Sequence, residues 1–341
     1  MKALNKERDE RIDILRFIAI IGILVAHSYP DPWLFQLRNF DVTLMVLLLG
    51  TSFYLSQRGK ELKYLPYLRK RFNRLVVPTW QLLVIFFAVF YLISKLFGDE
   101  YYFTIEEVIA SFTLMEGIGY VWIMRVFFLI ALISPLLLAI SNRIKNNTVY
   151  FLFLVAGYFL YIGLLLINGK LEGNMGMVFQ NFVVYGVGYG LVAAFGMRLK
   201  QFSVKEIWFY FLFFLGIFLY LMFQNDFAQT QAFKYPPQLY YFAYGLMGSL
   251  FLYILLDVSF IKKIFMNKFV AFVSRTSLWL YLWHIIFVEF MKLFESEMSI
   301  ISDSFITRFL YIFITSLIVT YIQEMVKKYM KNRKRNQASI S

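Results

Sequence analysis

The sequence predicts an all-α, polytopic integral membrane protein with about ten transmembrane helices and both ends in the cytoplasm. Of its 341 residues, 60% are hydrophobic and only 16% are charged, whereas soluble domains are about 45–50% apolar and about 25% charged. Phe alone contributes 40 residues. A soluble core of this size could not bury so much apolar surface, so lipid must be the solvent for most of it.

Ten apolar runs are long enough to be membrane spans, each of which needs about 20 mostly apolar residues. They lie near residues 12–29, 40–57, 76–97, 119–140, 148–167, 178–197, 206–224, 238–257, 270–293 and 304–326. No soluble domain fits between or after them. We therefore expect one membrane domain over residues 1–341, with a helical core at about 11–326 and a basic cytoplasmic tail at 327–341.

The distribution of positive charge predicts the orientation. With the N-terminus in the cytoplasm, 27 of the 34 Lys and Arg residues fall in cytoplasmic segments, which is the bias that membrane insertion imposes. The same bias accounts for the net charge of +13, so we expect no nucleic-acid partner. The first run resembles a signal peptide, but no small-x-small cleavage site follows it, and we expect it to be retained.

The composition also limits the chemistry. The chain has no cysteine and only two histidines, His27 and His284. This excludes disulfides, a cysteine nucleophile, and thiolate or multi-histidine metal sites. We expect no metal and no permanently bound cofactor.

Arg16 and His27 are the first candidate site residues. They are 11 residues apart, which at about 100° per residue places both on one face of a helix and about 16 Å apart along it. A polar stripe of this kind usually faces the bundle interior or a wet cavity. Alternatively, Arg16 extends to lipid headgroups and pairs with Asp13, while His27 is interfacial. The spacing alone leaves both interpretations open.

Two other polar groups need an explanation. A basic cluster before the third run includes Arg71 and Arg74, and is either a positive-inside anchor or a phosphate-binding surface. Ser277, Tyr281 and His284 share one face of the ninth run. A histidine there is either a hydrogen-bonded structural group or part of a functional site.

The outer segments carry further candidate site residues, and each of these also has a simpler structural explanation. Glu116, Trp122 and Arg125 lie near the start of the fourth run, where Trp122 could equally be an interfacial aromatic residue. The stretch Lys234-Tyr-Pro-Pro precedes the eighth run, and its prolines could simply set the start of that helix.

Taken together, these segments resemble the acyltransferase 3 family, polytopic bacterial membrane enzymes that move acyl groups, commonly acetyl, from acyl-CoA to hydroxyls of surface glycans. Arg16 and His27 match the family's Arg-x10-His pattern. The other similar stretches are 70–78, 120–137, 274–284 and, as in some members, 234–237. One difference lies in the second run, where the family often ends with Phe-Phe-x-x-Ser-Gly and only Gly50 remains here, so no role is carried over for that serine.

The resemblance implies that acyl-CoA, most simply acetyl-CoA, donates an acyl group to an extracytoplasmic or lipid-linked glycan, in the cytoplasmic membrane of a bacterium. His27 would be the general base, because its ordinary pKa lies near neutrality. Candidate residues for the other roles are Arg16, Arg71 and Arg74 for the CoA phosphates, Asp13 as an orienting group, and His284, Tyr281, Ser277, Trp122, Arg125 and Glu116 for the acceptor or the oxyanion. A covalent acyl-histidine route stays open, and the sequence does not give the oligomeric state.

A transporter is the competing interpretation. An intramembrane Arg and His stripe could also serve export of a glycan, lipid or anion by alternating access. Transporters often show paired inverted halves with helices broken at matching positions, and this sequence shows no such pairing. A noncatalytic assembly or sensing subunit is a third possibility that only an activity test addresses.

Overall fold

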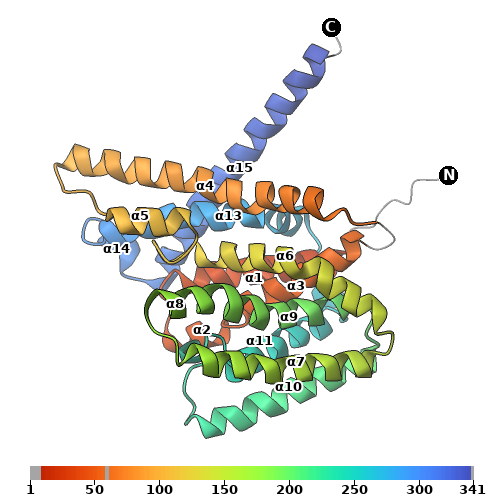
Figure 1. Cartoon of the computed structure of the whole chain (residues 1–341). Coiled ribbons are helices and arrows are strands. Elements are labelled where there is room, and N and C mark those ends of the chain that lie inside the picture. Colours follow the sequence, from red (N-terminus) through yellow and green to blue (C-terminus); the bar gives the residue numbers. More distant parts are fainter. Residues whose placement is uncertain (1–8, 58–60, 339–341) are drawn as a thin grey trace.

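The computed structural model describes residues 9–57 and 61–338, and over these residues it contains helices and no β-strand (Figure 1). The predicted all-α class is therefore confirmed. The basic residues of segments 1–8 and 58–60, and tail residues 339–341, lie outside the described chain.

Each predicted apolar run corresponds to a helix, and short helices lie in several of the connections. The long helices are α1 (Glu10–Ala26), α3 (Asp41–Gln57), α4 (Tyr64–Phe97), α6 (Trp122–Arg143), α7 (Asn147–Asn168), α9 (Tyr185–Arg198), α10 (Val204–Gln224), α11 (Leu239–Leu255), α13 (Lys268–Leu293) and α15 (Phe305–Ala338). The short ones are α2 (Pro32–Leu37), α5 (Ile105–Phe112), α8 (Gly173–Val178), η1 (Phe179–Val184), η2 (Thr230–Phe233), α12 (Ser259–Phe265) and α14 (Ser299–Ser302).

Eight helical segments of the described chain are long and apolar enough to cross a membrane, and the bent pair α11–α12 would make a ninth. Helix α1 has only 17 residues, fewer than the roughly 20 that a straight span needs. The protein is thus a multi-pass membrane protein, while the count of ten and the cytoplasmic position of both ends stay predictions.

The helices differ in how much of their surface faces other helices. In α3 and α9 most side chains are buried, whereas α10 buries only Ile207, Tyr210 and Phe214. Figure 1 shows α7 and α10 at one edge of the bundle and α4 at the other, while the C-terminal part of α15 extends away from it. The apolar outer faces of α7 and α10 have no protein partner in the described chain and suit contact with lipid.

Small residues let α3 and α9 approach closely. A Cβ added at Gly50 would lie 1.9 Å from the carbonyl oxygen of Ala193, and one at Gly196 would lie 2.1 Å from that of Leu47. Thr51 also donates a hydrogen bond of 2.7 Å to the carbonyl of Gly196. Close backbone approach at glycines, supported by hydroxyl contacts, is how helices associate without a hydrophobic driving force in lipid.

Gly50→Ala should therefore destabilise the protein, because the new methyl group forces α3 and α9 apart. We expect an overpacking cost of about 1–3 kcal/mol, seen as a lower thermal unfolding temperature of the purified protein in detergent. Gly216→Ala is the matched control, since nothing lies within 4 Å of a Cβ there. Equal unfolding temperatures for the two variants would contradict the close approach.

Candidate functional site

Helices α1 and α13 pack side by side and run in the same direction. Asp13 near the start of α1 contacts Ser274 near the start of α13, and His27 at the end of α1 contacts His284 further along α13. The two helices thus hold a charged cluster at one end and a histidine pair at the other. The predicted common face of Arg16 and His27 is the face that α1 turns toward α13.

The two histidines form a hydrogen-bonded pair. Nδ1 of His27 lies 2.7 Å from Nε2 of His284. Their ring centroids are 4.9 Å apart and their planes are within 17°, so the two nitrogens meet edge to edge between the rings. His284 is fully buried, while His27 keeps part of its surface exposed.

The hydrogen-bond network assigns the tautomers. Nδ1 of His284 contacts the backbone carbonyl of Tyr281, which can only accept, so this nitrogen carries the hydrogen. Nε2 of neutral His284 is then an acceptor, and Nδ1 of His27 donates to it. This leaves the lone pair of neutral His27 on Nε2, the ring nitrogen without a hydrogen bond in the described chain, so this nitrogen is available to take a proton.

Tyr120 joins the histidine pair to an acidic residue that the sequence analysis did not single out. Its ring lies edge-on to His27, with centroids 5.1 Å apart, and its hydroxyl donates to Oε1 of Glu289 at 2.7 Å. Lys292 approaches the same oxygen at 2.7 Å, and the hydroxyl of Tyr281 donates to the carbonyl of Tyr120 at 2.6 Å. The sequence signal that could have identified Glu289 is an acidic residue within an apolar span.

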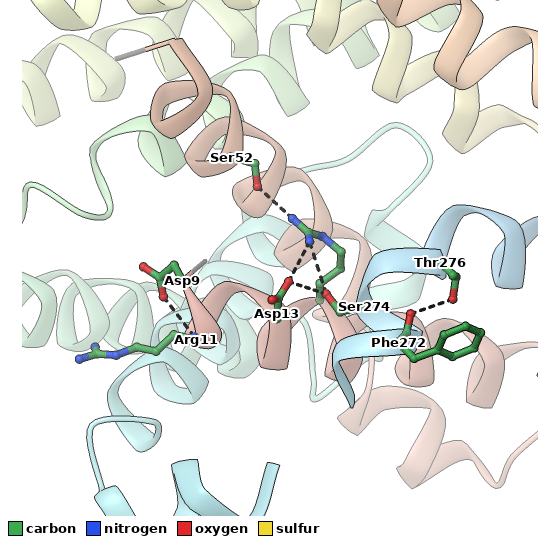
Figure 2. A network of polar contacts seen from close by, with 8 residues as sticks. Asp9, Arg11, Asp13, Ser52, Phe272, Ser274 and Thr276 are labelled. Carbon is green, nitrogen blue, oxygen red and sulfur yellow. Dashed lines mark hydrogen bonds and ion pairs between the residues drawn. The ribbon is translucent and has the colours of Figure 1, made fainter. Parts of the chain in front are cut away.

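Arg16 lies at the centre of the charged cluster at the other end (Figure 2). Its guanidinium is 3.4 Å from Asp13, 3.4 Å from Ser274 and 3.0 Å from Ser52. Ser274 in turn donates to Asp13 at 2.9 Å. The orienting role predicted for Asp13 fits this geometry, although Asp13 acts on Arg16 together with two serines from α3 and α13.

The structure brings the predicted basic residues into one cavity of about 660 Å³, a size typical of small-molecule sites. Arg16, Arg71 and Arg74 line it, and Arg275 adds a fourth guanidinium that the sequence analysis left out. Ser277 and Tyr281 also line it.

One part of the cavity wall lies close to the histidine pair, although neither histidine lines the cavity. Ile23 and Tyr281 form this part of the wall. The backbone N–H of His27 donates to the carbonyl of Ile23, and the carbonyl of Tyr281 contacts His284. A ligand extending from the arginines along α1 would therefore approach the histidine pair from the side of Ile23 and Tyr281.

Three other candidates take no direct part in this arrangement. Arg125 is buried and donates to the carbonyls of Leu114 and Met115, at 2.5 and 2.7 Å, and to Oδ1 of Asn181 at 2.6 Å. Glu116 is exposed in the loop before α6. No hydrogen bond or ring contact within the described chain joins Arg125, Glu116 or Trp122 to either histidine.

These features define a class: a multi-pass helical membrane protein with a basic cavity one helical turn from a hydrogen-bonded histidine pair. The model of the acyltransferase 3 family, an acyltransferase domain, matches residues 9–324. The chain belongs to the acyltransferase 3 family and is a membrane acyltransferase. Comparison with curated proteins and with solved structures gave no significant match.

The contacts of Arg125 predict a structural role. Arg125→Met should lower the thermal unfolding temperature, because each buried acceptor left without its donor costs about 1–3 kcal/mol, while turnover per folded molecule should change little. Arg143→Met, an exposed residue of the same helix, is the control for loss of charge. A variant that unfolds like wild type but has lost turnover would instead support contact with acceptor or oxyanion.

Proposed function

We propose that this acyltransferase moves an acyl group, most simply acetyl, from cytoplasmic acyl-CoA to a hydroxyl of an extracytoplasmic or lipid-linked glycan. The observation that carries the proposal is the single cavity that is lined by four arginines and extends to Ile23 and Tyr281, one helical turn from the histidine pair. Acyl transfer from CoA needs an anion site and a base separated by the length of the CoA arm, and the cavity arginines and His27 would supply them.

The arginine end of the cavity would hold the phosphates of CoA. Guanidinium groups match phosphate oxygens bidentately and stay charged at any physiological pH. Asp13 partly neutralises Arg16, so the net positive charge comes from Arg71, Arg74 and Arg275. The distance of about 16 Å between Arg16 and His27 along α1 would be bridged by the flexible arm that carries the thioester.

His27 would act as the general base. Its Nε2 takes the proton of the acceptor hydroxyl as the oxygen forms a bond to the thioester carbonyl, and the tetrahedral oxyanion then expels the CoA thiolate, which recovers the proton as a thiol. His284 accepts from Nδ1 of His27 throughout and shares the positive charge that develops. The products are an acyl ester of the glycan and free CoA.

Tyr281 and Ser277, two of the candidates for binding the oxyanion, differ in how their hydroxyl groups are engaged. The hydroxyl of Tyr281 is committed to the carbonyl of Tyr120, so it would hold the walls of the site in place. Ser277 lines the cavity, and its hydroxyl could donate to the oxyanion. A covalent acyl-histidine route would use the same Nε2 of His27 as a nucleophile.

The first test is a donor assay on the full chain in nanodiscs, with binding and slow hydrolysis of acetyl-CoA as readouts. His27→Ala should bind acetyl-CoA normally but lose turnover by about 10²–10⁴-fold, the usual contribution of a general base. Arg71→Ala and Arg74→Ala should weaken binding, and Arg143→Ala, an exposed arginine outside the cavity, should not.

The outcomes separate the competing functions. Failure of well-folded wild type to bind any acyl-CoA would overturn the donor site and make anion or lipid transport the next hypothesis to test. Rapid formation of an acylated protein that depends on His27 would replace direct transfer by the covalent route.

Ser52 offers a finer test of the donor site. Ser52→Ala removes the closest hydroxyl contact of Arg16 and should weaken acetyl-CoA binding by about fivefold, the worth of roughly 1 kcal/mol from one hydrogen bond. Ser56→Ala is the matched control, because Ser56 lines the same cavity but donates to the carbonyl of Phe53. Equal binding by the two variants would show that Ser52 does not position Arg16.

A further inference from the structure

A buried lysine lies outside the cavity just described. Lys234, in the segment between η2 and α11, is only 4% exposed. Its ammonium has no hydrogen-bond or ion-pair partner in residues 9–57 and 61–338. Three aromatic rings surround it, with centroids 5.4 Å (Tyr235), 5.6 Å (Trp122) and 5.8 Å (Tyr241) from Nζ.

The aromatic rings do not replace a counter-charge. Removing an ammonium from water costs several kcal/mol, whereas a cation–π contact returns about 0.5–2 kcal/mol. The carboxylate of Asp41, which like Lys234 lies near Tyr241, is already engaged, since its two oxygens accept from Arg38 at 3.0 Å and from the backbone N–H of Val42 at 2.6 Å. The ammonium therefore has no counter-charge in the described chain, while its Nζ keeps some contact with solvent.

Two hydroxyl groups near Lys234 are only weakly engaged. The hydroxyls of Tyr189 and Tyr241 are buried and make no hydrogen bond of ordinary geometry in the described chain, although they approach each other and Tyr241 approaches the hydroxyl of Thr43. The ring of Tyr241 contacts the ammonium, and the ring of Tyr189 lies 6.4 Å from that of Trp122. An ammonium and two weakly engaged O–H groups together make a cluster of donors, and the ligand that such a cluster fits is an anion with several oxygens.

The cluster lies near His27 and outside the arginine cavity. Lys234 and Arg38 are both close enough to act electrostatically on His27, and neither lines that cavity. Trp122 is partly exposed and Tyr235 is 47% exposed, so both aromatic residues keep surface that a sugar ring could contact.

We propose that Lys234, Tyr241 and Tyr189 bind the carboxylate or phosphate of an anionic sugar in the acceptor, with Trp122 and Tyr235 against the sugar ring. The anion fixes the acceptor so that a neighbouring hydroxyl faces Nε2 of His27. This inference rests on the proposed acyl transfer for the role of the sugar, while the anion site itself can be tested without turnover.

The test is calorimetric binding to the full chain in nanodiscs, with CoA in excess so that the arginine cavity is filled. The probes are glucuronate, glucose 1-phosphate and, as the neutral match, glucose. We expect at least one anionic probe to bind and glucose not to bind. Lys234→Met, which keeps the apolar stem between the rings, should weaken that binding at least tenfold, and Lys234→Arg should retain most of it. The control is Lys170→Met, which removes an exposed cation.

Tyr241→Phe keeps the test decisive if Lys234→Met does not fold. It deletes only a hydroxyl that makes no hydrogen bond of ordinary geometry in the described chain, so the fold should be kept while affinity for the anion falls severalfold. Failure of both anionic probes to bind, or equal binding by wild type and Lys234→Met, would overturn the proposal. The probe that binds more tightly distinguishes a uronate from a phosphosugar.

The anion site and the donor site can fail separately. The same titration in Arg71→Ala/Arg74→Ala without CoA removes two of the four cavity arginines and tests whether anion binding still depends on Lys234. Anion binding that depends on Lys234, together with failure of wild type to bind acyl-CoA, would support the anion site and reject the donor site. Acyl-CoA turnover without anion binding would support the donor site and reject the anion site.

Discussion

The parallel packing of α1 against α13 is the constraint on which the site depends. One contact, Asp13 with Ser274, helps to orient Arg16, and another, His27 with His284, fixes the tautomer of His27. Both lie on the same seam, so a shift of one helix along the other would disturb both. Ion pairs at the start of α1, from Arg11 to Asp257 and from Asp9 to Lys200, oppose such a shift.

Hydrogen bonds on this seam matter more than they would at a soluble surface. Hydrocarbon offers no partner for an orphaned polar group, so each must be satisfied within the protein. The arginines reach the cavity from α1, α4 and α13, and the serines that hold Arg16 come from α3 and α13. With the apolar side chains of α6, five helices of the described chain therefore line the cavity, and the close α3–α9 contact at Gly50 is part of its support.

Features that follow from helical periodicity could be predicted from the sequence, whereas contacts between neighbouring helices could not. The 11-residue spacing of Arg16 and His27 predicted their common face, and the basic cluster predicted Arg71 and Arg74. The sequence did not reveal Ser52 or Glu289, because their partners lie on other helices and single hydroxyl or acidic groups give no periodic signal. Arg125 illustrates the same limit: its position suggested the site, while its guanidinium donates to loop carbonyls before α6, a contact that the sequence does not show.

Under the proposed function, the separation of the charged cluster from the histidine pair has a physical reason in the bilayer. The phosphates of CoA are too costly to bring into hydrocarbon, so they would stay near water, beside the arginines. The neutral thioester would be carried inward by its arm, past the apolar wall at Ile23, toward His27. Only the acyl group would then have to pass from one end of the seam to the other. A site built in this way would keep the charged donor on one side and admit the acceptor from the other, with His27 between them.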